Sequence, residues 1–375
     1  METKKLGFGL MRMPLIDPNK PKTVDINHVC QMVDTFLERG FTYFDTAYMY
    51  HSFKSEKITK EVLVDRHPRH SYTLTTKLPI MFLKSEEDNQ RIFDEQLEKC
   101  GVDYFDYYLL HNLGVDHYDM AKRFKSFEFV SKLKAEGKVK HIGFSFHDSA
   151  ELLDEILTEH PEMEFVQLQI NYIDWENESI QSRKCYEIAR KHNKPVIVME
   201  PIKGGSLIDI PKEAQEILKN DQPNMSMASW AIRFAASHEG IMMVLSGMSS
   251  LEQLIDNTSY MSDFKPMTSH EFKLIDDVVE IIKKSIIIPC TGCQYCVDGC
   301  PKNIPIPKYF TLYNADKQSL NKGFSTQQMY YENTAATHGK ASDCIGCKQC
   351  EKSCPQHLPI VEHLKTIAAH FEEDE

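Results

Sequence analysis

The sequence has no long apolar run and no excess of positive charge. None of its 375 residues belongs to a stretch of the roughly 20 apolar residues that a helix needs to cross a bilayer. The first residues, METKKLGFGLMRMP, lack the apolar core that follows the lysines of a secretory signal. The formal net charge is −12, whereas general nucleic-acid binding requires a basic face. We therefore expect a cytoplasmic protein that binds neither membrane nor nucleic acid.

Cysteine is scarce over most of the chain and abundant near its C-terminal end. Cys30, Cys100 and Cys185 are spread over the first 289 residues, and eight more lie between positions 290 and 354. A secreted disulfide scaffold would distribute its cysteines through a small domain, and no export signal is present. The three scattered cysteines fit buried packing positions. The eight clustered thiols are expected to stay reduced and to bind metal.

The clustered cysteines form two copies of one motif. In each copy, three cysteines at x2 spacing precede a fourth that follows after x3 and is itself followed by proline. The copies are Cys290, Cys293, Cys296 and Cys300 with Pro301, and Cys344, Cys347, Cys350 and Cys354 with Pro355. This spacing is typical of proteins with two [4Fe–4S] clusters, whereas zinc ribbons use two well-separated CxxC pairs. The motifs therefore predict two [4Fe–4S] clusters.

The fourth cysteine of each motif is predicted to bind the cluster of the other motif, as in two-cluster ferredoxins. The expected ligand sets are Cys290, Cys293, Cys296 and Cys354 for one cluster, and Cys344, Cys347, Cys350 and Cys300 for the other. However, Cys344 follows Cys300 by 44 positions, a longer connector than a minimal ferredoxin needs. The exchange of fourth ligands between the two clusters is therefore open at this point. The prediction of two clusters does not depend on it.

From residue 6 to about residue 260, short apolar runs alternate with longer helical stretches. Runs that stay apolar throughout indicate strands buried on both faces of a parallel sheet. The predicted strands span residues 6–10, 41–45, 72–77, 104–111, 139–145, 165–171, 195–200 and 241–246. Helical segments at 25–40 and 86–101 end in glycine, a common helix stop. Eight such units predict an α/β fold, a (β/α)8 TIM barrel, rather than a doubly wound sheet.

The character of the chain changes after a further predicted helix at residues 269–285. The following tail contains the eight clustered cysteines and several prolines. We therefore expect two domains, a barrel over residues 1–285 and a small ferredoxin-like iron–sulfur domain over residues 286–375.

Four polar side chains lie at or just beyond the ends of consecutive predicted strands. Asp45, Lys77 and His111 end their strands, and Tyr50 follows Asp45 by five positions. In a TIM barrel these strand ends converge on the face that holds the active site. Each side chain alone has a structural explanation, as a helix cap, a rim aromatic, a solvated lysine or a core histidine. Their joint occurrence favours an active site.

Together with the stretch Tyr43-Phe44-Asp45-Thr46-Ala47-x-x-Tyr50, these positions resemble the aldo/keto reductases over roughly residues 3–260. With its cysteine motifs, the chain resembles the branch of that family that has a C-terminal ferredoxin-like domain. The resemblance implies that Tyr50 protonates a substrate carbonyl oxygen as hydride arrives. The ammonium of Lys77 would lower the Tyr50 pKa, Asp45 would hold Lys77, and His111 would orient the carbonyl.

The resemblance also implies a nicotinamide cofactor, NADP(H) or NAD(H). Ser145 and Gln167 would hold its carboxamide, and Met199 stands where the family stacks a tyrosine. Gln253 replaces the family's arginine for the 2′-phosphate, which leaves the choice between NADPH and NADH open. The cofactor contacts implied in this way are Ser145, Gln167, Met199, Pro201, Lys203, Gly204, Ser246, Gly247, Ser249, Gln253 and Asn257.

These features lead us to expect an oxidoreductase that reduces an aldehyde or ketone and whose clusters exchange electrons with a ferredoxin or flavoprotein. Hydride transfer moves two electrons together, whereas a cluster passes one at a time, and no flavin site is recognisable in the sequence. Two alternatives stay open: an electron-transfer subunit whose barrel binds a nucleotide or partner without turnover, and clusters that are purely structural.

Overall fold

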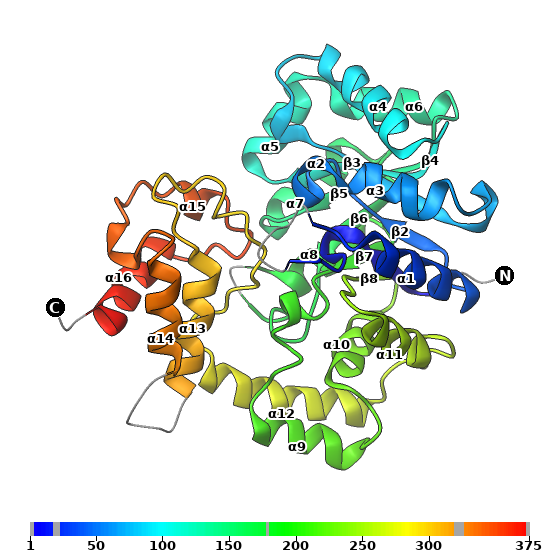
Figure 1. Cartoon of the computed structure of the whole chain (residues 1–375). Coiled ribbons are helices and arrows are strands. Elements are labelled where there is room, and N and C mark those ends of the chain that lie inside the picture. The colour runs from blue at the N-terminus through cyan, green and yellow to red at the C-terminus, as the bar shows by residue number, and fades with distance from the viewer. Residues whose placement is uncertain (1–3, 18–22, 178–179, 319–325, 373–375) are drawn as a thin grey trace. The chain divides into compact units, whose positions relative to one another are not determined.

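The structure, a computed structural model, describes residues 4–17, 23–177, 180–318 and 326–372 (Figure 1). The chain forms two compact units. We call Met1–Ile202 with Met225–Ser269 the barrel unit, and Lys203–Asn224 with His270–Glu375 the cluster unit. The sequence-based domain boundary after residue 285 stays a prediction. The compact units differ from it, because Lys203–Asn224 and most of the helix before residue 285 pack with the C-terminal residues.

Eight parallel strands form a closed barrel in which each strand pairs with its neighbours in sequence, and β8 pairs with β1. This confirms the predicted TIM-like barrel. The strands are β1 (Leu6–Gly9), β2 (Tyr43–Asp45), β3 (Thr73–Leu78), β4 (Phe105–Leu113), β5 (Val139–Phe146), β6 (Phe165–Gln169), β7 (Val196–Met199) and β8 (Ile241–Ser246).

The strand limits agree with the sequence pattern to within two residues. Strand β6 ends at Gln169, two residues before the predicted end, because Asn171 forms a local turn. Its side-chain oxygen accepts from the backbone N–H of Asp174 at 2.9 Å, and its amide donates to the Asp174 carboxylate at 2.8 Å. Such side-chain bonds compete with strand pairing.

Helices and short helical turns follow the strands of the barrel unit (Figure 1). Several begin at side-chain caps, as at Asp25, which accepts from the backbone N–H of His28 at 3.1 Å. The helix over Glu87–Cys100 ends at Gly101 with φ 68°, as its glycine predicts. The α-helices are α1 (Ile26–Glu38), α2 (Tyr50–Phe53), α3 (Ser55–Thr59), α4 (Glu87–Cys100), α5 (Val115–Arg123), α6 (Ser126–Ala135), α7 (Ala150–Glu159), α8 (Ser182–Lys191), α10 (Met227–Ala236) and α11 (Leu251–Met261).

The barrel interior is filled by side chains rather than left as a channel. At Gly143 in β5, an added Cβ would lie 2.4 Å from the backbone oxygen of Phe165, so only glycine fits between β5 and β6. The interior cluster of buried side chains consists of Tyr43, Leu109, Phe165, Ile197, Met243 and Leu245. This packing fixes the strand register and therefore the positions of the residues at the strand ends.

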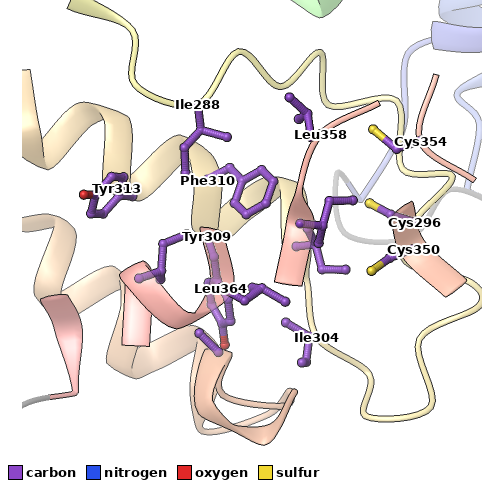
Figure 2. Close-up of a cluster of buried hydrophobic side chains, with 14 of the residues drawn as sticks. Ile288, Cys296, Ile304, Tyr309, Phe310, Tyr313, Cys350, Cys354, Leu358 and Leu364 are labelled. Carbon is purple, nitrogen blue, oxygen red and sulfur yellow. The ribbon is translucent and has the colours of Figure 1, made fainter. Parts of the chain in front are cut away.

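The cluster unit is mainly helical and has its own core, with tyrosine and phenylalanine rings beside cysteines (Figure 2). Tyr309, Phe310 and Leu364 are almost completely buried there. Its helices are α9 (Lys212–Asp221), α12 (Ser269–Ser285, of which Ser269 belongs to the barrel unit), α13 (Ile306–Gln318), α14 (Thr326–Ala335), α15 (Gln349–Lys352) and α16 (Ile360–Phe371). Among the helices that the structure describes, none is long and apolar enough to cross a bilayer.

Candidate active site and iron–sulfur centres

A buried ion pair lies at the carboxyl end of the barrel. The Nζ of Lys77 donates to Oδ1 of Asp45 at 2.5 Å and to the carbonyl oxygen of Thr46 at 2.9 Å. Strand register produces this pair, because Asp45 in β2 pairs with Thr75 in β3, two residues before Lys77. Lys77 and Asp45 are 1% and 3% exposed, so both charges depend on each other for stabilisation.

Tyr50 and His111 complete the group. The Nζ of Lys77 lies 5.1 Å from the centre of the Tyr50 ring. The rings of Tyr50 and His111 have centroids 6.2 Å apart and meet edge to face at 83°. The structure therefore brings together the four side chains that the sequence predicts for the active site, from the ends of three neighbouring strands and the turn after β2.

Burial sets the protonation states of this group. It holds the pKa of His111 well below 6.5, and the charge of Lys77 acts in the same direction, so the imidazole is neutral at pH 7. The Nδ1 atom of His111 is buried without a hydrogen-bond partner. A neutral imidazole has one N–H to donate, which suits a substrate carbonyl oxygen.

The Tyr50 hydroxyl differs from the sequence-based expectation. Part of the Tyr50 surface is accessible, yet its dense surroundings raise its pKa well above 10, and the carboxylates of Asp45 and Glu200 add to this. Arg12 opposes the shift, but not enough to reverse it. Lys77 does not lower the pKa as expected, because its charge is paired with Asp45. Tyr50 is therefore a protonated phenol, which is the form a proton donor needs.

The backbone directly after Tyr50 is strained. His51, Ser52 and Phe53 have φ values of 50°, 53° and 67°, all in the left-handed region that favours glycine. Each such non-glycine residue costs about 1 kcal/mol or more, and such residues concentrate at functional sites. The Nε2 of His51 lies 3.1 Å from the carbonyl oxygen of Leu10 and helps to hold this turn.

A second buried carboxylate, Glu56, lies behind Lys77 and is not among the residues predicted from the sequence. Its Oε1 accepts from Thr76 Oγ1 at 2.7 Å and from Gln96 Nε2 at 2.6 Å. The same Gln96 amide donates to the carbonyl oxygen of Lys77 at 3.0 Å. Tyr108 in turn donates to Gln96 Oε1 at 2.6 Å. This network fixes the backbone from which the Lys77 side chain extends.

A signal for Glu56 is present in the sequence. Leu63 follows Glu56 by seven positions, a spacing that places both on one face of a continuous helical segment, and the structure buries both. A carboxylate on a buried helical face is rare unless it has partners. Burial raises the pKa of Glu56 to about 7.

Replacing Glu56 by glutamine is expected to flatten the pH dependence of stability. The folded pKa near 7 lies above the ordinary 4.5, so the unfolding free energy is highest below pH 4.5 and falls as the pH rises toward 7. Above pH 7 the ionised form costs about 3 kcal/mol by this shift. Glutamine keeps the accepting oxygen without the charge. We therefore expect Glu56→Gln to gain about 2–3 kcal/mol at pH 8 and little at pH 4.5.

Urea unfolding from pH 4.5 to pH 8, followed by tryptophan fluorescence, measures this effect, because Trp175 and Trp230 both belong to the barrel unit. Glu61→Gln is the matched control, since Glu61 is exposed on the adjoining helical turn. An equal stability gain in both variants, or a pH profile of Glu56→Gln parallel to that of the unmodified protein, would contradict the assignment.

The predicted cofactor contacts of the barrel unit lie at strand ends. Ser145 and Gln167 pair directly between β5 and β6, and the Oε1 of Gln167 is buried without a partner. Met199 ends β7, Pro201 is buried two residues later, and Gly247 follows β8. The unpartnered Oε1 of Gln167 can accept hydrogen bonds from the N–H groups of a carboxamide.

The segment after β8 is held by bonds within itself and to the loop after β1. The Oγ of Ser246 accepts from Asn257 Nδ2 at 2.9 Å. Gln253 accepts from the backbone N–H of Ser249 at 2.8 Å, and Ser249 Oγ donates to the carbonyl oxygen of Arg12 at 2.8 Å. Gln253 therefore contributes no charge here, and its oxygen is engaged in the turn.

Lys203 and Gly204 do not belong to the same compact unit as the other predicted cofactor contacts. Lys203 is 1% exposed, and its Nζ donates to Oε1 of Gln356 at 3.1 Å. Gln356 follows Cys354 by two positions. The charge of Lys203 partly opposes the rise in the pKa of Cys354 that burial causes. Within the cluster unit, this lysine thus lies near a predicted cluster ligand.

The eight motif cysteines gather in two groups, both within the cluster unit. Cys300 from the first motif and Cys344, Cys347 and Cys350 from the second line one open hollow. The mixed origin of this set supports the exchange of fourth ligands, despite the long connector. No three described His, Cys, Asp or Glu side chains converge as one metal ion requires, whereas four thiolates around a hollow suit the corners of a cube.

The second group consists of Cys290, Cys293, Cys296 and Cys354. Burial raises the pKa of Cys296, and the thiolates of the other three act on it in the same direction. Figure 2 shows Cys296 and Cys354 beside Cys350 at one side of the hydrophobic core. The donor set is again four thiolates, as a [4Fe–4S] cluster requires.

Comparisons with known proteins agree with this geometry. The chain is similar to "Uncharacterized oxidoreductase YqkF" of Bacillus subtilis, at 22% identity over 73% of this chain and 92% of that protein. Its fold is similar to an aldo/keto reductase from Klebsiella pneumoniae solved with NADP and acetate (TM-score 0.60, 18% identity, 74% of this chain and 95% of that one). Over 75 residues it is 32% identical to a subunit of the ion-translocating oxidoreductase complex of Buchnera aphidicola, covering 20% of this chain and 13% of that protein.

Two family matches account for nearly all of the sequence. Residues 289–361 match the 4Fe–4S dicluster domain. Residues 5–280, well over half of the chain, match the aldo/keto reductase family. The protein is therefore an oxidoreductase of the aldo/keto reductase family that carries a C-terminal 4Fe–4S dicluster domain.

Proposed function

We propose that the protein reduces an aldehyde or ketone at the site formed by Asp45, Tyr50, Lys77 and His111, and that its clusters exchange electrons with a separate redox protein. The observation that carries the proposal is the convergence of the buried Lys77–Asp45 pair with Tyr50 and His111 at the carboxyl end of the barrel. Catalytic groups of TIM barrels lie at this end.

Each side chain has one task in this proposal. Tyr50 holds the proton at its hydroxyl and gives it to the carbonyl oxygen, which becomes the alcohol. Lys77, with its Nζ 5.1 Å from the centre of the Tyr50 ring, helps to hold the phenol in position. Asp45 keeps Lys77 charged and in place, and the neutral His111 donates a hydrogen bond to the carbonyl oxygen. A nicotinamide cofactor, when bound, supplies the hydride to the carbonyl carbon.

Ser145 and Gln167 are proposed to bind the carboxamide of the nicotinamide. The orphaned Oε1 of Gln167 accepts its N–H groups, and Ser145 lies on the neighbouring strand. The neutral Gln253 offers no charged contact to a 2′-phosphate, so we propose that the protein accepts NADH as well as NADPH. The NADP complex of the Klebsiella relative supports a nicotinamide but does not decide between the two.

An anaerobic assay of the fully loaded protein tests the proposal. NADH, NADPH and a reduced ferredoxin are each supplied as donor against a panel of aldehydes and ketones. We expect alcohol formation with at least one nicotinamide. Absence of turnover with every donor across the panel would contradict carbonyl reduction.

A second candidate function is electron transfer without turnover at the barrel. The similarity of the chain to part of an ion-translocating oxidoreductase complex favours it, as do the replaced cofactor positions Met199 and Gln253. In that case the clusters would be reduced and reoxidised by partners, and loss of the Tyr50 hydroxyl would leave the physiological activity unchanged.

A further inference from the structure

We infer that electrons pass between this protein and its partner at one particular cluster, the one held by Cys300, Cys344, Cys347 and Cys350, and that the partner is an acidic iron–sulfur carrier protein. This inference rests on the proposed exchange of electrons with a redox protein. It adds the point of entry, the docking surface and the charge of the partner. We call the hollow lined by these four cysteines the outer hollow.

The two cysteine groups differ in their access to solvent. In the outer hollow, Cys347 is exposed, and the nearby Ile345 is 62% exposed. In the other group, Cys296 and Cys354 are buried, and Cys290 and Cys293 are only partly accessible. Electron transfer slows steeply with distance, so a partner exchanges electrons fastest with the cluster whose ligands reach the surface. That cluster is the one in the outer hollow.

The rim of the outer hollow is positively charged. Among the described residues that line it, the charged ones are Lys302 and Lys348, and both are exposed. Lys348 is paired only loosely, with 3.7 Å between its Nζ and Oε2 of Glu351, and it keeps 67% of its side chain in solvent. The whole chain carries a net charge of −12, so two lysines at this opening stand out against an acidic background.

This surface fits a transient electron-transfer partner. Opposite charge across an interface accelerates encounter and orients the partners. Redox complexes are small and weakly bound, so a few charged residues around an apolar centre suffice. Ile345 provides the apolar centre beside Cys347, and Lys302 and Lys348 provide the charges. A carrier with an acidic face around its own cluster is complementary to this arrangement.

The electron balance is simple. The reduced carrier loses one electron and is oxidised, and the cluster in the outer hollow gains that electron and is reduced. No covalent bond forms or breaks and no proton is required. A second carrier molecule supplies a second electron after the first has moved to the other cluster. Near that other cluster, the Nζ of the buried Lys203 lies 3.1 Å from Oε1 of Gln356, two residues after Cys354.

Stopped-flow reduction of the anaerobic, fully loaded chain by a reduced acidic [2Fe–2S] ferredoxin tests the inference. We expect the double variant Lys302→Glu with Lys348→Glu to lower the second-order rate constant about tenfold or more at low ionic strength. Lys365→Glu is the control for charge reversal elsewhere on the cluster unit, one reversal against the two of the double variant, because Lys365 is exposed in α16 and does not line the outer hollow. Its rate constant is expected to stay within about twofold of the unmodified protein, because the change lies outside the docking surface.

The salt dependence of the rate constant is measured on the unmodified protein. It therefore does not depend on whether a variant folds and takes up its clusters. The rate constant is expected to fall as salt is added, since attraction between opposite charges is screened. A rate that is unaffected by salt, or one that falls equally in the double variant and in Lys365→Glu, would overturn the inference. Cluster reduction potentials are measured in parallel, and a slower rate explained entirely by a shifted potential would also overturn it.

The outcome is separable from the proposed carbonyl reduction. If the lysines control the rate of cluster reduction but no carbonyl is turned over, the docking surface stands and the proposed reaction fails. If a nicotinamide supports carbonyl reduction but the lysine substitutions do not change the rate constant of reduction by ferredoxin, the proposed reaction stands and the docking surface fails.

Discussion

Tyr50→Phe is expected to lower the rate of carbonyl reduction by roughly 10²–10⁴-fold, the usual contribution of a positioned proton donor. The substitution removes only the hydroxyl, and the ring that meets His111 at 6.2 Å is retained. Nicotinamide affinity should therefore change little while the chemical step slows. Single-turnover measurement of cofactor oxidation, with cofactor binding determined separately, distinguishes these two effects.

Tyr48→Phe is the matched control for this experiment. Tyr48 lies two residues earlier in the same turn, but its hydroxyl donates to the carboxylate of Glu95 at 3.1 Å rather than joining the tetrad. Its loss should leave the rate nearly unchanged. If Tyr50→Phe behaves like Tyr48→Phe in the physiological reaction, the carrier function without turnover is the better account.

Removal of iron is expected to unfold much of the cluster unit. Cys296, Cys350 and Cys354 belong to its hydrophobic core together with residues such as Tyr309 and Leu364 (Figure 2). A ligand that binds only the folded state at 100 times its dissociation constant stabilises that state by about 2.7 kcal/mol. We therefore expect the rate of proteolysis within residues 290–354 to rise by about 100-fold or more after anaerobic chelation.

Mass spectrometry of the proteolytic fragments locates the sites of cleavage. Cys185→Ala serves as a comparison, because Cys185 is a buried cysteine of the barrel unit outside both motifs and should leave iron content and protection unchanged. Equal protection of the cluster unit from proteolysis with and without iron would contradict this prediction. It would mean that the unit folds without its clusters.

Much of the barrel could be predicted from sequence because its strands obey a simple rule. A strand buried on both faces is apolar throughout, and this pattern located β8 at Ile241–Ser246 and placed the other strands within a few residues. The positions of Asp45, Lys77 and His111 followed, since the carboxyl ends of parallel barrel strands converge. The helix predicted at residues 269–285 is present at Ser269–Ser285.

What the sequence could not give depends on contacts between distant residues. The Glu56 network joins residues 56, 76, 96 and 108, and no local pattern predicts that one glutamine connects all of them. The pKa of Tyr50 was expected to fall because Lys77 is nearby. The Tyr50 pKa rises instead, because burial raises it and the charge of the nearby Lys77 is paired with Asp45. The exchange of cysteine ligands stays a prediction, and the support for it, the lining of one hollow by Cys300 together with cysteines of the second motif, lies in the fold and not in the spacing.

The path of the chain between the barrel unit and the cluster unit limits where the two could be separated. Lys203–Asn224 lies in sequence between β7 and α10 of the barrel, yet it packs with the cluster unit, where Lys203 donates to Gln356. A gene fragment that stops after residue 285 would remove Gln356 and with it this hydrogen bond of Lys203. The C-terminal module is therefore not an interchangeable cassette, and its transplantation onto another barrel would require the segment after the seventh strand to be inherited with it.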